Sequence, residues 1–132
     1  MINDEEKRVL AQYRLEKSDQ AMADVKLLVD NQRWIGTANR LYYAAFNAVS
    51  ALLLMDGINA KTHNGVVGMF GQHYVKTGKV SAELGSVYSR LFTLRTNGDY
   101  GDFFDVQEGD ILPLLKPAEK LIDTIKTLIN NK

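Results

Sequence analysis

The chain contains no cysteine among its 132 residues. This absence excludes disulfide bonds, thiolate catalysis, and zinc or iron–sulfur sites built on cysteine, and it fits a reducing compartment. Histidine is almost as scarce, since the chain has only His63 and His73, which are too few for a histidine-rich metal site. The sequence therefore predicts no metal site and no cofactor.

The chain also lacks an excess of charge of either sign. Sixteen Lys and Arg residues balance 16 Asp and Glu residues, so no overall field attracts the protein to nucleic acid or anionic lipid. The local distribution is less even, because residues 57–82 carry three lysines and no acid, whereas residues 96–110 carry five acids and no base. A local binding surface is compatible with this composition, but a broadly basic one is not.

A long hydrophobic run is missing as well. The most apolar stretch, residues 41–55, contains Asn47 and Ser50 and is too short to cross a bilayer. The first ten residues, MINDEEKRVL, are charged and are not typical of a signal peptide. We therefore expect a soluble, cytoplasmic protein without membrane contact.

The chain also lacks a Walker phosphate-binding loop and the GxSxG and HExxH motifs.

Helical periodicity is what the sequence has instead. Five segments, beginning near residues 3, 38, 62, 81 and 105, place apolar residues at spacings of three and four, as amphipathic helices do. The first, residues 3–31, has a stripe that includes Val9 and Tyr13. The second, residues 38–55, is apolar on most sides and should be the most buried. These patterns predict an all-α fold, an up-and-down antiparallel helical bundle of four to five helices, in one domain over residues 1–132.

Capping residues, glycines and prolines predict the helix boundaries. Asp105 and Glu108 are spaced as a capping box for the last helix. Pro113 and Pro117 should kink that helix or delay its regular start. The other expected boundaries are helix starts at Gly36–Thr37, Thr62 and Ser81, helix stops at Asp56–Gly57 and Thr77–Gly78, and a turn at Asn97–Gly98.

Arg95 departs from the apolar pattern. Leu84, Tyr88, Leu91 and Arg95 follow one another at spacings of four, three and four, so the arginine lies on the inner stripe of its helix. One interpretation is a cation at a helix C-terminus that pairs with one of the acids following it. The other is a guanidinium held at a cleft, where it binds a phosphate or carboxylate with two hydrogen bonds. The sequence leaves both interpretations open.

Two further residues are candidates for the same site. Tyr100 either covers the end of the bundle or places a hydroxyl beside Arg95. His63 is either a partly exposed residue near an N-cap or a catalytic histidine, which would need an orienting group. The candidate catalytic residues are therefore Arg95, Tyr100 and His63. Arg40, the one charge in an apolar helix, is a weaker candidate.

Three stretches in this order, ANRLYYAAFNAVSALLL, KTHNGVVGMFGQHYVKTG and LRTNGDYGDFF, resemble the HEPN domain family. The resemblance covers residues 7–128 and implies a small helical bundle that is often encoded beside a minimal nucleotidyltransferase. Family members that cleave RNA carry the motif R-x4-6-H, brought together across a homodimer interface. Arg95 matches the arginine of that motif, whereas Tyr100 stands at the position of the histidine.

This departure implies binding rather than cleavage, because a tyrosine with a pKa near ~10 is a poor general base at neutral pH. We expect a nucleotide- or RNA-related regulatory module that acts with a nucleotidyltransferase partner in a toxin–antitoxin or defence system. One alternative is a metal-independent ribonuclease that uses Arg95 with Tyr100 or His63. Another is a helical dimerisation protein with no ligand. The expected ligand-binding residues are Arg95, Asn97, Asp99 and Tyr100.

The large aromatic residues, together with the resemblance, predict a homodimer. The chain has more of them than one small bundle encloses comfortably, and the resemblance implies a two-fold interface near Arg95. The aromatic residues in question are Tyr42, Tyr43, Phe46, Phe92, Phe103 and Phe104.

Overall fold

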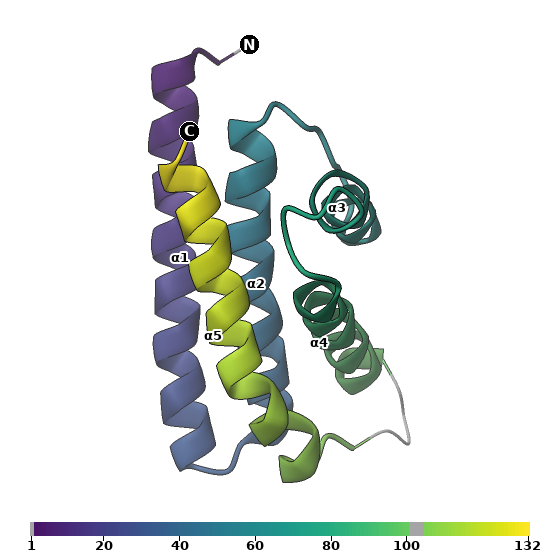
Figure 1. Cartoon of the computed structure of the whole chain (residues 1–132). Helices are drawn as coiled ribbons and strands as arrows, with labels where there is room; N and C mark the ends of the chain where they lie inside the picture. The colour runs from purple at the N-terminus through teal and green to yellow at the C-terminus, as the bar shows by residue number, and fades with distance from the viewer. Residues whose placement is uncertain (1, 101–104) are drawn as a thin grey trace.

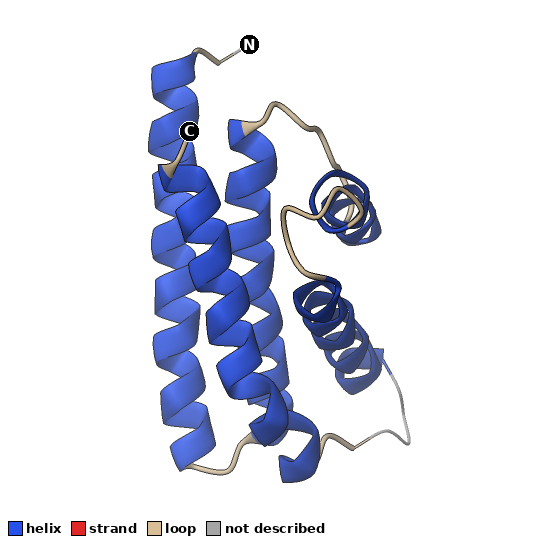
Figure 2. Cartoon of the chain, viewed as in Figure 1, coloured by secondary structure: helices blue, strands red, loops and turns tan. Residues whose placement is uncertain are grey.

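The computed structural model consists of helices joined by short connections (Figures 1 and 2). It describes residues 2–100 and 105–132, with the backbone alone for residues 98–100. No strand occurs among these residues, which confirms the expected all-α class. The helices are α1 (Asp4–Asp30), α2 (Trp34–Met55), α3 (His63–Phe70), α4 (Ala82–Tyr100) and α5 (Glu108–Asn130), with a π-helical turn, η1 (Gly71–Val75), directly after α3.

The helices form the expected up-and-down bundle. In Figure 1, α1, α2 and α5 run side by side, α2 and α5 in the direction opposite to α1, while α3 and α4 lie on the other side of α2. Short α3 is viewed almost along its axis and connects α2 to α4. Within the described residues, no helix combines the length and the hydropathy that crossing a bilayer requires.

Helix α2 is the most buried element, as its wide apolar surface predicted. Helices α1, α3, α4 and α5 all contact it. Towards α1 it offers small residues, and the Ser18 hydroxyl donates a hydrogen bond of 2.7 Å to the carbonyl oxygen of Ala44. Small side chains let two helix backbones approach closely, so α1 and α2 form the largest helix–helix contact in the described chain. The fully buried alanines of α2 are Ala44, Ala45, Ala48 and Ala51.

The first turns of α1 differ from the expected stripe. Val9 and Tyr13 are 67% and 53% exposed, whereas Ala11 and Leu15 are buried. Residues two apart point to nearly opposite sides of a helix, so Val9 and Tyr13 lie opposite the buried Ala11. Helix α2 runs alongside at this level, since Arg14 donates a hydrogen bond of 3.3 Å to the carbonyl oxygen of Ser50. The expectation that Val9 and Tyr13 face the core is therefore wrong. Periodicity shows which residues share a helix face, but not whether another helix covers that face.

Several predicted helix ends are confirmed. The Thr62 hydroxyl accepts a hydrogen bond of 2.9 Å from the backbone amide of Gly65 and caps α3. The Ser81 hydroxyl accepts one of 3.2 Å from the amide of Leu84 at the start of α4. Gly57 and Gly78 have φ angles of +69° and +82°, the left-handed conformation that ends a helix and that glycine adopts without strain.

Other predicted boundaries are wrong. Helix α2 begins at Trp34, before Gly36–Thr37. Helix α4 continues through Asn97–Gly98 to Tyr100, so this dipeptide does not form the expected turn. Helix α5 begins at Glu108, before both prolines, so they do not delay its start beyond themselves, and the kink that was the other expectation stays a prediction.

The capping box of α5 is also displaced from its expected position. It consists of Gln107 and Asp110 rather than Asp105 and Glu108. Asp105 instead accepts a hydrogen bond of 3.0 Å from the side-chain amide of Gln107. The sequence thus contains two overlapping pairs with capping-box spacing, and the later pair, Gln107 and Asp110, forms the cap.

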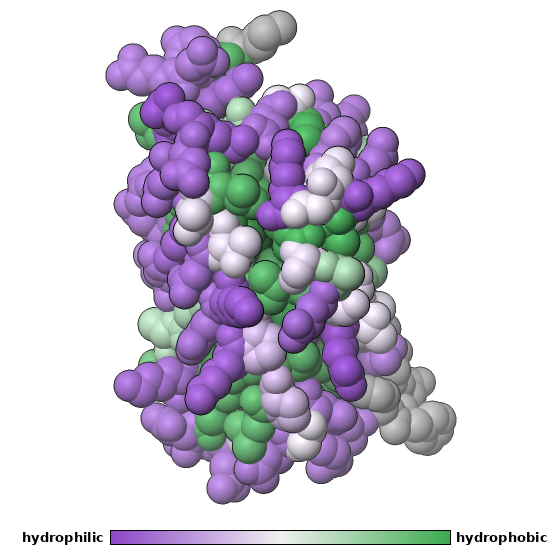
Figure 3. All heavy atoms as spheres, in the orientation of Figure 1, coloured by the Kyte–Doolittle hydropathy of each residue, from purple (hydrophilic) through white to green (hydrophobic). Residues whose placement is uncertain are grey.

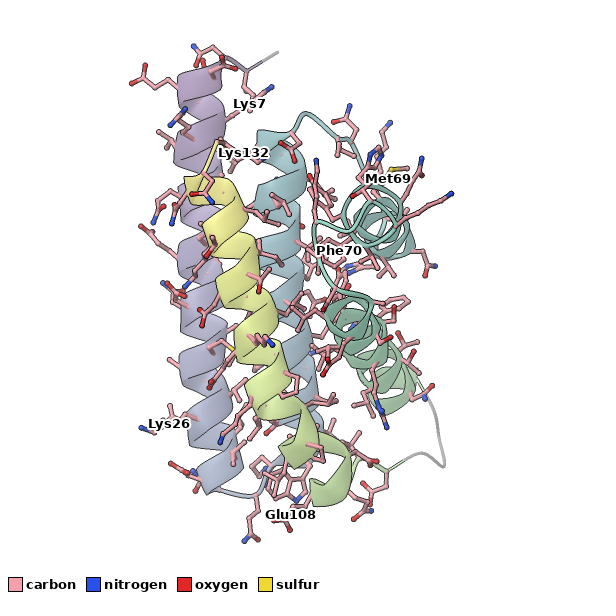
Figure 4. All side chains as sticks on the ribbon, in the orientation of Figure 1. Lys7, Lys26, Met69, Phe70, Glu108 and Lys132 are labelled. Atoms are coloured by element: carbon pink, nitrogen blue, oxygen red, sulfur yellow. The ribbon has the colours of Figure 1, made fainter. Side chains whose placement is uncertain are left out.

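Asp56 joins three elements at one end of the bundle. It follows the last residue of α2, accepts a hydrogen bond from the Tyr74 hydroxyl of η1, and pairs with Lys132. Figure 4 shows Lys132 just beyond α5, at the same end of the bundle as the C-terminus of α2. Burial acts to raise the pKa of Asp56, but the hydrogen bonds from Lys132 and Tyr74 and the charge of Lys79 outweigh burial and lower it below 3.8.

We therefore predict that Asp56→Asn lowers the free energy of unfolding by about 1 kcal/mol at neutral pH, because a neutral amide accepts more weakly from Lys132 and Tyr74. The stabilisation by Asp56 is present above pH 3.8 and is lost as the pH falls through the lower pKa of the folded state. Urea denaturation of both proteins from neutral to acidic pH measures this difference. Asp123→Asn, at an exposed position of α5, is the control and should have little effect. A difference between wild type and Asp56→Asn that persists unchanged in acid would contradict the assignment.

Candidate functional site

Arg95 lies at the contact between α4 and α2. The buried residues Tyr88 and Leu91 precede it on the same stripe. Its guanidinium carbon is 5.6 Å from the centre of the Tyr42 ring and 5.5 Å from the centre of the Tyr43 ring. Nη2 also donates a hydrogen bond of 3.2 Å to the Tyr43 hydroxyl. The cation is therefore held against two aromatic rings of α2, where each ring face attracts positive charge.

His63 approaches the same pair of rings from α3. Its Nδ1 atom is 2.6 Å from the Tyr42 hydroxyl oxygen, and its ring stacks on Phe46 with centres 4.6 Å apart. Burial raises the pKa of Tyr42 to about 12, so this hydroxyl keeps its proton at neutral pH. Burial, followed by the charge of Arg95, lowers the pKa of His63 below 6.5. We assign the Tyr42 hydroxyl as the donor and Nδ1 of a neutral His63 as the acceptor, which leaves the imidazole proton on Nε2.

These contacts define one group of side chains, which we call the α2–α4 cluster. Its inner part is fully buried and consists of Tyr42 and Tyr88, whose rings stack in parallel at 6.2 Å. Its outer part is half-buried and carries the cation and the imidazole. A rigid inner part therefore supports an outer part that solvent reaches. The outer residues are Tyr43, Phe46, His63, Phe92 and Arg95.

Arg40 lies at the edge of this cluster. Its guanidinium carbon is 5.7 Å from the centre of the Tyr43 ring, and its Nε atom is 3.7 Å from a carboxylate oxygen of Asp24. Tyr43 is therefore close to two arginine side chains. Since Arg40 is paired with an acid of α1, its main visible role is to connect α2 with α1.

The structure places only part of the site that the sequence predicted. Arg95 and His63 come together at the cluster, and Asn97 lies half-buried two residues beyond Arg95. The side chains of Asp99 and Tyr100, and residues 101–104 with Asp102, Phe103 and Phe104, lie outside the described part of the chain. Among the described residues, no group of three or more His, Asp or Glu side chains is arranged to hold a metal ion.

Two functional features were missed in the sequence. One is the orienting group that His63 requires, which is the hydroxyl of Tyr42, 21 residues earlier in the chain. The other is the hydroxyl of Tyr43, which bonds Arg95 from 52 residues away. The only signal is the pair of adjacent tyrosines in a mostly apolar helix, and the sequence pattern places both among the aromatic residues that predict a dimer.

A groove between α1 and α5 is one hollow outside the cluster. It has a volume of about 520 Å³ and is lined by apolar side chains that include Met22, Val29 and Leu115, with charged residues at its rim. Figure 3, in which polar residues cover most of the face that carries α5, shows only small apolar areas between them. The hydrogen bond of 2.6 Å from Lys126 to Asp19 links the two helices. Because none of the described aromatic rings lines it and its Lys126 is paired with Asp19, the groove is a weaker candidate for a ligand site than the cluster.

Comparison with known proteins identifies relatives over nearly the whole chain. Residues 11–128 match the HEPN domain family. A protein of Thermotoga maritima named "UPF0332 protein" is 40% identical over 126 residues, which are 96% of this chain and 96% of the relative. Two proteins of Methanocaldococcus jannaschii are also similar. "Putative toxin MJ0605" is 30% identical over 87% of this chain and 85% of its own length, and "Putative toxin MJ0142" is 26% identical over 89% and 80%.

The lowered pKa of His63 generates a prediction that NMR can test. The Cε1 proton of His63 should titrate with a midpoint below 6.5. Arg95→Gln should move this midpoint upward, because it removes a positive charge that disfavours the imidazolium ion. Arg90→Gln, which changes an exposed arginine of the same helix, should leave it unchanged. A wild-type midpoint at or above 6.5, or equal shifts in the two variants, would show that His63 does not have these surroundings.

Proposed function

Because the chain belongs to the HEPN domain family, we propose that it is a binding and regulatory module that holds a phosphate of a nucleotide or an RNA at Arg95. The observation that carries this proposal is the position of the Arg95 guanidinium against the Tyr42 and Tyr43 rings, with its hydrogen bond to the Tyr43 hydroxyl. These contacts restrict the side chain before a ligand arrives, so binding loses less rotamer entropy. A guanidinium also presents paired donors that match two phosphate oxygens.

The protein acts, in this proposal, with a second protein. Two relatives carry the word toxin in their names, which supports a role in a toxin–antitoxin or related defence system. The partner we propose is a minimal nucleotidyltransferase, and the compartment is the cytoplasm. The family membership supports the nucleotidyltransferase partner. The absence of cysteine, which fits a reducing compartment, supports the cytoplasm.

A metal-independent ribonuclease is the second candidate function, and one observation favours it. Tyr42 orients a neutral imidazole, that of His63, on the same rings that hold Arg95. A neutral imidazole acts as a general base through its unprotonated nitrogen. This function therefore requires the other tautomer of His63, in which Nδ1 donates to the Tyr42 oxygen and Nε2 is left without a proton. Against this function stands the motif itself, because Tyr100 occupies the position at which the RNA-cleaving members of the family have histidine. The binding module is therefore the function we favour.

Replacing Arg95 tests the proposed ligand site. Arg95→Ala should weaken the binding of nucleoside monophosphates and short single-stranded RNA about tenfold or more, because an arginine–phosphate contact contributes a few kcal/mol. Isothermal titration calorimetry measures the affinities, and Arg90→Ala is the matched control on the exposed face of α4. Equal binding by wild type and Arg95→Ala, or no binding by either, would leave Arg95 with a structural role and support the third alternative, dimerisation without a ligand.

We also propose that the protein is a homodimer whose interface includes Tyr43 and Phe92 of the α2–α4 cluster, which are half-buried and available to a second copy. Tyr42 and Phe46 also contribute to the sequence prediction of a dimer, but Tyr42 belongs to the core and Phe46 stacks on His63, so we do not assign them to the interface. Covering such rings removes apolar surface from water, which favours association. Residues from both copies would then surround Arg95.

Light scattering should give about twice the chain mass of 14.8 kDa for the wild type. Phe92→Asp should shift the protein towards the monomer, because it places a charge in the apolar part of the interface. Tyr13→Asp, which changes an aromatic residue that is 53% exposed on α1, should remain dimeric, and circular dichroism checks that both variants are folded. A monomeric wild type at micromolar concentration would overturn the proposed interface.

A further inference from the structure

We propose that His63 and Phe46 form a base-binding subsite, so that the ligand of Arg95 is a nucleotide recognised by its base as well as by its phosphate. This inference rests on the proposed function, because it assumes that Arg95 binds the phosphate. It adds recognition of the base and a second contact residue on another helix. The argument depends on the position of His63, the hydrogen bond that occupies its Nδ1 atom and the partial exposure of its ring.

His63 and Arg95 lie on the same two rings. The Tyr42 ring centre is 5.6 Å from the guanidinium carbon and 5.7 Å from the centre of the imidazole. The sum of these distances limits the separation of the two groups to about 11 Å. The imidazole also meets the Tyr43 ring edge-on at 6.0 Å. A nucleotide spans a comparable distance between its phosphate and the far edge of its base, so one ligand can reach both groups.

The chemistry of His63 suits a base better than a second phosphate. Its hydrogen bond with Tyr42 occupies Nδ1, and its ring is neutral, so it adds no charge to attract an anion. It offers an N–H donor at Nε2 and a flat ring, half-buried and already stacked on Phe46. Bases carry acceptor atoms such as N7 of purines along their edges, and they stack on aromatic and histidine side chains. Tyr42 thereby acts as a positioning residue, which fixes the tautomer and the ring of His63.

A comparison of two ligands separates the base from the phosphate. AMP and ribose 5-phosphate carry the same phosphate group, and only AMP has a base. The wild type should bind AMP at least about fivefold more tightly than ribose 5-phosphate, since stacking of a base on an aromatic side chain contributes ~1–3 kcal/mol. His63→Ala should lose this preference and still bind ribose 5-phosphate as the wild type does. Arg95→Ala should weaken both ligands, and His73→Ala, at a histidine of η1 outside the cluster, should change neither.

A second measurement uses the unaltered protein, in case His63→Ala does not fold. The NMR signal of the His63 Cε1 proton should shift when AMP is added and should stay in place with ribose 5-phosphate. Equal affinity of the wild type for both ligands, or AMP binding that His63→Ala leaves unchanged in a folded protein, would overturn the subsite while the phosphate site at Arg95 stands. Binding of neither ligand by the wild type would overturn the subsite and count against the proposed function as well.

Discussion

The burial of α2 on most of its sides is the constraint on which the rest of the structure depends. A helix with so little polar surface is stable only where other helices cover it, and α1, α3, α4 and α5 all pack against it. Its small residues meet α1, where Ser18 bonds directly to the backbone of Ala44. Its large aromatic residues lie towards α3 and α4, as the stacking of Tyr42 on Tyr88 shows. The distribution of small and large side chains around α2 therefore determines which neighbour approaches closely and which is held apart by rings.

The candidate site follows from this packing. Tyr42 is fully buried, so its ring has a fixed position. The hydroxyl of this ring forms a hydrogen bond with His63 of α3, and the guanidinium of Arg95 of α4 lies over the ring. Two groups with useful chemistry are thus held by a core residue rather than by mobile loops, an arrangement that favours precise binding. The same residue connects stability with function, because any change that moves the Tyr42 ring would displace the imidazole and the guanidinium together.

The sequence predicted the parts of this structure that depend on local pattern. The existence of the helices, the glycine stops at Gly57 and Gly78, and the position of Arg95 on the inner stripe of its helix all follow from residues a few positions apart. The exposure of Val9 could not be predicted, because the apolar residues in the first turns of α1 do not share one face, and only the packing shows that the face of Ala11 and Leu15 is the covered one. The hydrogen bond between Tyr42 and His63 could not be predicted either, since it joins two helices across an irregular connection. The sequence singles out His63 as a candidate but not Tyr42 as its partner, and only the fold shows that they meet.

The decisive question is whether the oriented imidazole of His63 serves binding or chemistry. Incubation of the purified protein with RNA in the presence of a metal chelator is the most direct measurement. A binding module with tyrosine at position 100 should leave the RNA intact, or cleave it only weakly, because no histidine stands at the position that the R-x4-6-H motif requires. Robust metal-free cleavage that Arg95→Ala abolishes would contradict this account and identify the protein as a ribonuclease.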